Sequence, residues 1–524
     1  MQLNVTITLS IITHTITKNN TKDIALAQSK QTNHIEPYGM ALKEVSSIMV
    51  GDTSGFVTLD DYNVKTVPNP DTPRSTTDDM ILQKMSENHI RVAVVGNVDA
   101  GKSSLIGTLV SGTLDDGRGS ARSMIMKHKH ERDSGRTSTS DTHLLGLDVD
   151  GRTVISRLHT KNSWAEIVLR SHRTVGLMDL AGHEKYLKTT IYGVSRGFAD
   201  YALVLVNAAR PPTHMTSHHL KLCLYMGIPC IIVLTKADRC PSHVYKSTLH
   251  DISRMLKSPE IGQRPYVIKN DSDIEKTTWT LAKNLLTPVV TISSVTGDGL
   301  DTLKRLLTDV PQRRVFHRHF RDKAFEMLVD DTYNVPGVGA VISGFVSRGE
   351  WKKGDKIFLG PLKDGSVVEL VPRSAHVART IVNNVWAGHS VCFALPKLPR
   401  GKRLLFQKTG GLVATMKPLV LKQSFTADIL LTRGTTVTVQ KGRFNPMLHI
   451  LNQKQSAKMM ELRLMDTDGS YTPLNDTGDV VMRQGDRATV KFCFKNRSAY
   501  LRPGMKVIIR EGQVIGYGVV KALL

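Results

Sequence analysis

The stretch that most constrains the fold of this chain is GNVDAGKSS, at residues 96–104. It follows the apolar run RVAVVG and leads into SSLIGTLV, so a buried strand is expected to pass through a loop into a helix. Glycines near both ends of the loop permit a tight turn whose N–H groups converge on phosphate oxygens. The helix presents its positive end to the same phosphates. We therefore predict a phosphate-binding loop formed by Gly96, Asn97, Val98, Asp99, Ala100, Gly101, Lys102, Ser103 and Ser104.

Two residues of this loop carry its chemistry. Lys102 is expected to reach the β- and γ-phosphates, and the Ser103 hydroxyl is expected to ligate Mg2+. The alternative is a glycine-rich turn that binds nothing. The apolar strand before the motif and the helix after it argue against that alternative.

A second stretch, DLAGHE at residues 179–184, ends another apolar run. The Asp179 carboxylate, at the end of a strand, is expected to hold Mg2+ through water. Gly182 has no side chain to block its N–H from the γ-phosphate. His183 follows directly, where its ring can orient an attacking water. A surface histidine without that role is the alternative interpretation of His183.

The third stretch, TKAD at residues 235–238, follows the apolar run CIIVL. The Asp238 carboxylate can accept two hydrogen bonds from guanine ring nitrogens, which adenine cannot offer, and the Lys236 stem can lie along the face of the base.

The fourth stretch is ISSVTGDGL, at residues 292–300. The Ser294 backbone N–H can meet guanine O6, with Ser293 and Val295 on either side. TKAD alone is a weak signal and also fits an ordinary turn. In this order behind the first two stretches, it predicts GTP and GDP rather than ATP.

The pattern of apolar residues around these motifs changes once along the chain. From about residue 89 to 310, strand-like and helix-like runs alternate, which predicts a mostly parallel sheet with helices on both faces. The charged stretch 311–321 is interpreted as a linker. Beyond it, short β-like runs alternate with turns, as in small β-barrels. The expected domains are a partly disordered extension with little helical period (1–85), a nucleotide-binding domain (86–312) and two barrels (322–410 and 411–524).

The composition of the chain indicates which classes of partner and which compartment are expected. The chain has 70 basic and 47 acidic residues, a net charge of +23, which favours a polyanionic partner, and nucleic acid over a lipid surface. No apolar run is long enough to cross a bilayer, and no signal peptide is expected. None of the five cysteines forms a CxxC pair, which is typical of reduced thiols in the cytoplasm.

The ordered set GNVDAGKS, DLAGHE, TKAD and SSV resembles the translational GTPases of the elongation factor Tu and elongation factor 1-alpha superfamily. Longer stretches resemble the eukaryotic GTP-binding protein 1 and 2 subfamily, over about residues 89–524. They include LDDGRGSARS (114–123), KHKHERDSGRTS (127–138) and VDDTYNVPGVGAVISG (329–344).

The resemblance implies a P-loop GTPase domain followed by two barrels, with a switch I segment at residues 127–145. In the family a switch I threonine ligates Mg2+. Thr137 is the matching position, and Ser138 and Thr139 are close rivals. Val98 matches an apolar gate beside the catalytic histidine, and Asp99 matches an aspartate of the phosphate loop. Thr235 departs from the resemblance, because most GTPases carry Asn there. One side-chain amide that ties the guanine loop to the phosphate loop is therefore expected to be missing.

The resemblance also implies a monomeric GTPase that binds aminoacyl-tRNA in its GTP state and hydrolyses GTP on the ribosome, with a possible need for an exchange factor. No arginine in the four motifs is an evident cis finger, so intrinsic hydrolysis is expected to be slow. One alternative is a GTPase of ribosome rescue or mRNA surveillance. Another is a GTP-controlled RNA-binding adaptor with negligible turnover. A metabolic P-loop kinase is disfavoured by TKAD and by the paired barrels.

Overall fold

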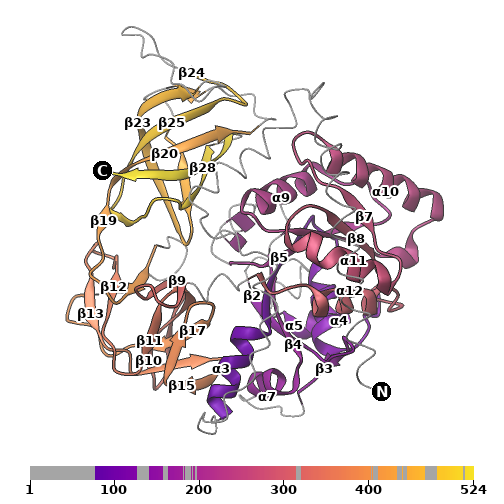
Figure 1. Cartoon of the computed structure of the whole chain (residues 1–524), viewed down its shortest axis with the longest axis horizontal. Helices are drawn as coiled ribbons and strands as arrows, with labels where there is room; N and C mark the ends of the chain where they lie inside the picture. The colour runs from indigo at the N-terminus through magenta and orange to yellow at the C-terminus, as the bar shows by residue number, and fades with distance from the viewer. Residues whose placement is uncertain are drawn as a thin grey trace, which may run out of the picture.

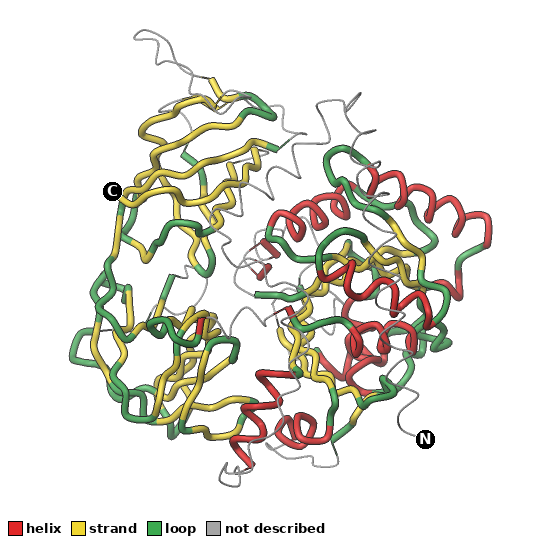
Figure 2. The backbone as a smooth tube through the Cα atoms, in the orientation of Figure 1, coloured by secondary structure: helices red, strands yellow, loops and turns green. Residues whose placement is uncertain are grey.

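The computed structural model describes most of the chain from residue 77 onward. The described residues are 77–126, 141–156, 163–180, 182, 190–191, 193–194, 198–313, 320–402, 404, 411–432, 439–440, 445–465, 481–511 and 514–524. Figure 1 shows an α/β domain on one side and two β domains on the other, and Figure 2 shows that the helices gather in the α/β part. No helix in these ranges is long and apolar enough to cross a membrane.

The α/β domain is built on one sheet, with the strand order β3-β2-β4-β1-β5-β6-β8-β7 among the described residues. β1 pairs in parallel with β4 and β5, and β2 and β3 add an antiparallel edge. The predicted mostly parallel sheet is confirmed. Its strands are β1 (His89–Gly96), β2 (Asp141–Leu147), β3 (Thr153–Val154), β4 (Arg173–Asp179), β5 (Tyr201–Asn207), β6 (Cys230–Thr235), β7 (Pro265–Val267) and β8 (Thr287–Thr291).

Helices cover both faces of this sheet because its central strands are apolar on both sides. Along β1, Val92 and Val94 pack in one buried cluster with α4, α11 and α12, whereas Ala93 and Val95 pack in another with α9 and α10. The helices described are α3 (Thr77–Glu87), α4 (Lys102–Ser111), α5 (Ser120–Ile125), α7 (Ser163–Arg170), α9 (His214–Tyr225), η3 (Ala237–Arg239), α10 (Ser242–Lys257), α11 (Asp271–Ala282) and α12 (Leu300–Asp309).

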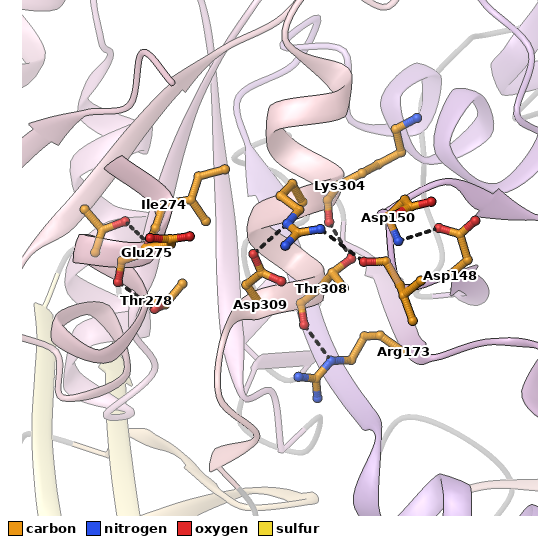
Figure 3. Close-up of polar contacts among 12 residues, drawn as sticks. Asp148, Asp150, Arg173, Ile274, Glu275, Thr278, Lys304, Thr308 and Asp309 are labelled. Carbon is orange, nitrogen blue, oxygen red and sulfur yellow. Dashed lines mark hydrogen bonds and ion pairs between the residues drawn. The ribbon is translucent and has the colours of Figure 1, made fainter. Parts of the chain in front are cut away.

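Hydrogen bonds connect helix α12 to β4 and to the chain between β2 and β3. The Arg173 guanidinium on β4 donates to the carbonyl oxygens of Thr308 (3.0 Å) and Val310 (3.1 Å). From the helix, Arg305 donates to the Val149 carbonyl at 3.1 Å. Figure 3 shows Arg173 pointing at the end of α12. These bonds hold the antiparallel edge against the body of the domain.

The middle β domain is an antiparallel sheet with the described order β13-β12-β18-β9-β10-β17-β14-β15, beside a β11-β16 pair. β18 was expected beyond the boundary at 410/411, in the last domain. It pairs instead with β9 and β12, so the middle sheet extends to residue 415. The strands are β9 (Glu326–Val335), β10 (Gly339–Arg348), β11 (Glu350–Lys352), β12 (Ile357–Gly360), β13 (Val368–Leu370), β14 (Ser374–Val377), β15 (Thr380–Val382), β16 (Asn384–Trp386), β17 (Ser390–Ala394) and β18 (Val413–Thr415).

The C-terminal β domain contains a closed six-stranded barrel, in the order β20-β25-β23-β22-β27-β28. The predicted fold class, an α/β domain followed by β domains, is confirmed. The strands described in the C-terminal domain are β19 (Leu421–Lys422), β20 (Ser424–Leu431), β21 (Val439–Gln440), β22 (Met447–Ile450), β23 (Gln453–Met465), β24 (Val481–Met482), β25 (Arg487–Phe494), β26 (Ala499–Tyr500), β27 (Lys506–Glu511) and β28 (Val514–Leu523).

A buried carboxylate joins the two β domains. Glu326 on β9 is 3% exposed and accepts hydrogen bonds from the Tyr500 hydroxyl (2.6 Å) and the Ser347 hydroxyl (2.5 Å). Arg502 pairs with it at 3.5 Å. Since Tyr500 and Arg502 come from the C-terminal domain, this network fixes that domain to the middle sheet.

Helix α3 begins in the segment that the sequence assigns to the extension with little helical period (1–85) and ends just beyond it, at Glu87. Its apolar residues Ile81, Leu82 and Met85 are buried in the core cluster of the middle domain, together with Val168 of α7. Figure 1 shows the helix between the middle domain and α7. The sequence signal is short because only one narrow face is apolar, and burial between two domains stabilises the helix.

Helix α9 makes the contact between the α/β domain and the C-terminal barrel. Tyr225, its last residue, donates a hydrogen bond to the Gly518 carbonyl at 2.6 Å and stacks on Tyr517 with ring centroids 4.1 Å apart. Lys506 donates to the Tyr225 carbonyl at 3.1 Å. The end of this helix is therefore bound to both β27 and β28.

Candidate nucleotide-binding site

The predicted phosphate loop joins β1 to α4. Gly101 has φ 82° and Asp99 has φ 59°, so the backbone turns twice through the left-handed region. The Lys102 ammonium donates to the carbonyl oxygens of Gly96 (3.2 Å) and Asn97 (2.9 Å). The loop therefore curls around the head of its own lysine, as a phosphate cradle requires.

Lys102 is 8% exposed. Burial lowers the pKa of its ammonium, while the negative charges of Asp179 and Asp99 act in the opposite direction. The two carbonyl oxygens and these carboxylates therefore offset only part of the cost of burying this cation. An anion entering the loop would meet a partly desolvated positive charge, which strengthens the attraction.

The pairing of β4 with β1 places Asp179 beside the phosphate loop. Asp179 ends β4, where it pairs with Val94 of β1 just before the loop. The Ser103 hydroxyl donates to the Asp179 carboxylate at 2.8 Å. A hydroxyl and a carboxylate at this spacing are ligands that suit Mg2+, which in such sites also takes oxygens from substrate phosphates. Within the described ranges, no group of three His, Cys, Asp or Glu residues could hold a metal by itself.

Gly182 lies directly against the phosphate loop. A Cβ built on it would stand 2.3 Å from Lys102 Nζ and 2.4 Å from the Gly96 carbonyl oxygen. Only glycine fits this approach, because any side chain at residue 182 would collide with the loop. His183 and Thr137, predicted to act in hydrolysis and in metal binding, lie outside the described residues.

Thr235 connects the guanine loop to the phosphate loop through its hydroxyl. Its hydroxyl is buried and donates to the Ala100 carbonyl of the phosphate loop at 2.9 Å, with a second contact to Val206 at 3.3 Å. This hydroxyl reaches the loop backbone from the end of β6 and makes a tie where Asn would use its amide. The two loops are tied together without an amide.

The guanine-reading residues are held by a second set of bonds. The Ser293 hydroxyl donates to the Asp238 carboxylate at 2.7 Å and accepts from the Val295 backbone N–H at 3.2 Å. Lys236 has φ 59°, a left-handed turn that starts η3. These contacts fix the Asp238 carboxylate in place at the pocket.

Removing the Thr235 hydroxyl tests this tie. Thr235→Val keeps the shape of the side chain and leaves the Ala100 carbonyl without its donor, which costs about 1–3 kcal/mol. We expect GDP to bind roughly 10-fold more weakly, measured by titration calorimetry. Thr280→Val, on the outer surface of α11, is the matched control and should bind GDP normally. Equal affinity of Thr235→Val and the wild type would contradict the tie.

The motifs meet around one pocket of about 190 Å³. Of the predicted residues, the pocket is lined by Val98, Asp99, Gly101, Lys102, Ser103, Ser104, Gly182, Thr235, Lys236, Asp238, Ser294 and Val295. The other predicted residues of these motifs each share a hydrogen bond with a lining residue: Gly96, Asn97, Ala100, Asp179 and Ser293. The lining also includes Asp115, Gly117, Arg118, Gly119, Arg122 and Arg239, which the motif analysis missed. The closely spaced glycines and arginines in LDDGRGSARS were the available signal.

The class of protein follows from this geometry together with one family match. The family of elongation factor Tu GTP binding domains matches residues 87–313, the range that holds all four motifs. The protein is therefore translational-GTPase-like. The chain belongs to the family of GTP-binding proteins 1 and 2.

The relatives match over most of the chain. GTP-binding protein 1 of Xenopus laevis is 35% identical over 453 residues, which cover 85% of this chain and 66% of the relative. GTP-binding protein 2 of Homo sapiens is 33% identical over 455 residues, or 86% and 72%. Elongation factor 1-alpha of Hyperthermus butylicus is 25% identical over 460 residues, or 82% and 96%.

Two solved structures share the fold. The bacterial selenocysteine-specific elongation factor aligns with a TM-score of 0.55 at 18% identity, covering 83% of this chain and 58% of its own. Translation elongation factor SelB from Methanococcus maripaludis, bound to a GTP analogue, also aligns with a TM-score of 0.55 at 18% identity, covering 83% and 79%. At this identity the match concerns the fold alone.

Proposed function

We propose that this protein binds GTP and GDP with Mg2+ and hydrolyses GTP on the ribosome, and that its GTP state binds aminoacyl-tRNA. The observation that carries the proposal is the convergence of the phosphate loop, Asp179, Gly182 and the guanine loops on one pocket. The names of the relatives, which include elongation factors, support the translational setting.

The chain's own residues would divide the work between charge and position. Lys102 and the loop N–H groups would hold the phosphates and stabilise negative charge as the terminal phosphate leaves. Ser103 and Asp179 would hold Mg2+, which neutralises charge on the phosphate oxygens. Gly182 would bring its N–H to the γ-phosphate, and His183 would orient the attacking water.

Hydrolysis on the ribosome is tested with His183→Ala. We expect ribosomes to stimulate GTP hydrolysis by the full chain, and the variant to lose roughly 100-fold of the stimulated rate, because a positioned group of this kind contributes on that order. Phosphate release is measured at saturating GTP with and without ribosomes. His243→Ala, on the exposed surface of α10, is the control and should keep the stimulated rate.

The outcomes separate the alternatives. A chain that binds no guanine nucleotide would overturn the whole proposal. Bound GTP with a flat rate in all conditions would favour the RNA-binding adaptor over a ribosome-triggered GTPase. If stimulation is seen, aminoacyl-tRNA binding that depends on both GTP and aminoacylation supports delivery. Its absence would favour a role in ribosome rescue or mRNA surveillance.

A further inference from the structure

The chain between α4 and α5 forms a wall of the nucleotide pocket that belongs to none of the four motifs. The Asp115 N–H donates to the Ser294 carbonyl at 2.9 Å, which joins this segment to the guanine loop. The Asp116 carboxylate accepts the backbone N–H groups of Arg118 (2.8 Å) and Gly119 (2.9 Å). The segment is therefore held in a defined turn on the rim of the pocket.

Close packing of the two helices sets the position of Arg122. A Cβ built on Gly107 of α4 would stand 2.2 Å from the Ala121 carbonyl oxygen, so the backbones of α4 and α5 nearly touch there. Arg122 follows Ala121 directly and lines the pocket, as do Ser103 and Ser104 at the start of α4. The packing thus places Arg122 beside α4, with its side chain against Gly119.

The order of base, ribose and phosphates in a nucleotide indicates which of these groups lies against this wall. Lys102 marks the end of the pocket that takes the β- and γ-phosphates. Asp238 and Ser294 mark the end that takes the base. The ribose and the α-phosphate must lie between these ends. Arg122 lies between them: its side chain lies against Gly119, on the wall that Asp115 joins to Ser294, and the preceding Ala121 packs on α4.

The chemistry of Arg122 suits a phosphate. Its side chain is half-buried, and it makes no hydrogen bond or ion pair with any of the residues described in the structure. Arg118, on the same wall, is exposed. A guanidinium offers a planar fork of donors that matches two phosphate oxygens, and partial burial reduces screening by water.

Resting on the proposed guanine-nucleotide site, we propose that Arg122 binds the α-phosphate of the bound nucleotide and positions it. Because GDP and GTP both carry that phosphate, the contact stabilises both states equally. Arg122 is a positioning residue that sets nucleotide affinity, and it leaves the transfer of the γ-phosphoryl group unchanged. Arg118 adds a weaker contact because its charge is screened by solvent.

The test compares Arg122→Ala, Arg122→Lys and the wild type in the full chain. Dissociation constants for GDP and GTP are measured by titration calorimetry, and single-turnover hydrolysis is measured at saturating GTP. We expect Arg122→Ala to weaken GDP and GTP by the same factor, roughly 10- to 100-fold, with the single-turnover rate unchanged. Arg122→Lys should recover part of the affinity because it keeps the charge without the fork. Arg254→Ala, with a side chain 74% exposed on α10, is the control.

Three results would overturn this assignment. Unchanged GDP affinity in Arg122→Ala would exclude the phosphate contact. Normal GDP affinity with a slower single-turnover rate would place the charge on the reacting phosphate. Loss of folding in both Arg122 variants, seen as lower melting temperatures without nucleotide, would make the residue structural. A wild type that binds neither GDP nor GTP would instead refute the proposed function itself, before any variant is compared.

Discussion

Lys102→Ala is expected to abolish nucleotide binding at micromolar protein while leaving the protein folded. Truncating one member of a buried, hydrogen-bonded charge pair costs about 2–5 kcal/mol, and phosphates bound in this loop would have Lys102 as their buried cation. The affinity for GDP should fall by roughly a thousandfold. The nucleotide-free protein loses little, because the desolvation that lowers the pKa of Lys102 is relieved when the ammonium is removed.

Thermal unfolding with and without GDP measures this effect. A ligand raises the melting temperature in proportion to the logarithm of its concentration over its dissociation constant, so the wild type should show a shift and Lys102→Ala none. Lys257→Ala, at the exposed end of α10, is the control and should keep the shift. An undiminished GDP-induced shift in Lys102→Ala would show that the phosphates bind elsewhere.

Leu82→Ala is expected to destabilise the chain by about 2–5 kcal/mol, because truncation of a buried leucine leaves a cavity. Leu82 is 1% exposed, and its carbonyl accepts a hydrogen bond from His389 Nε2 of the middle domain at 3.1 Å. Helix α3 also holds the α/β domain, where Lys84 donates to the carbonyl oxygens of Leu169 and Ser171. The loss should therefore loosen the contact between the two domains as well as the helix.

Urea unfolding of Leu82→Ala measures the stability, and small-angle scattering measures whether the domains separate. Met80→Ala is the matched control on the same helix, because Met80 is 45% exposed. We expect the midpoint to fall for Leu82→Ala and to stay within experimental error for Met80→Ala. Equal midpoints for the two variants would mean that α3 does not dock as described.

The sequence predicted the elements whose patterns are local and strong. β1 and β6 contain the apolar runs RVAVVG and CIIVL, since a strand buried on both faces is a continuous apolar run. Most residues of the phosphate and guanine loops were found because strand ends in a parallel sheet converge at one edge, which lets separate motifs be assigned to one site.

What the sequence left out depends on contacts between distant residues. Helix α3 has only a narrow apolar face, and its burial comes from a domain that begins more than two hundred residues later. The Thr235 tie required knowing that a hydroxyl at the end of β6 reaches the Ala100 carbonyl. Arg122 required the close approach of α5 to Gly107, which no spacing along the chain reveals.

The two ends of helix α9 have different neighbours. At its start, Thr213 caps the helix and accepts a hydrogen bond from the Asn97 side chain of the phosphate loop at 3.3 Å. At its end, Tyr225 is bound to Gly518 of the barrel. Twelve residues of α-helix form a stiff rod of about 18 Å. A single rigid helix thus connects the phosphate loop to the barrel. A movement of α9 at the phosphate loop must therefore be accompanied by a movement at the barrel.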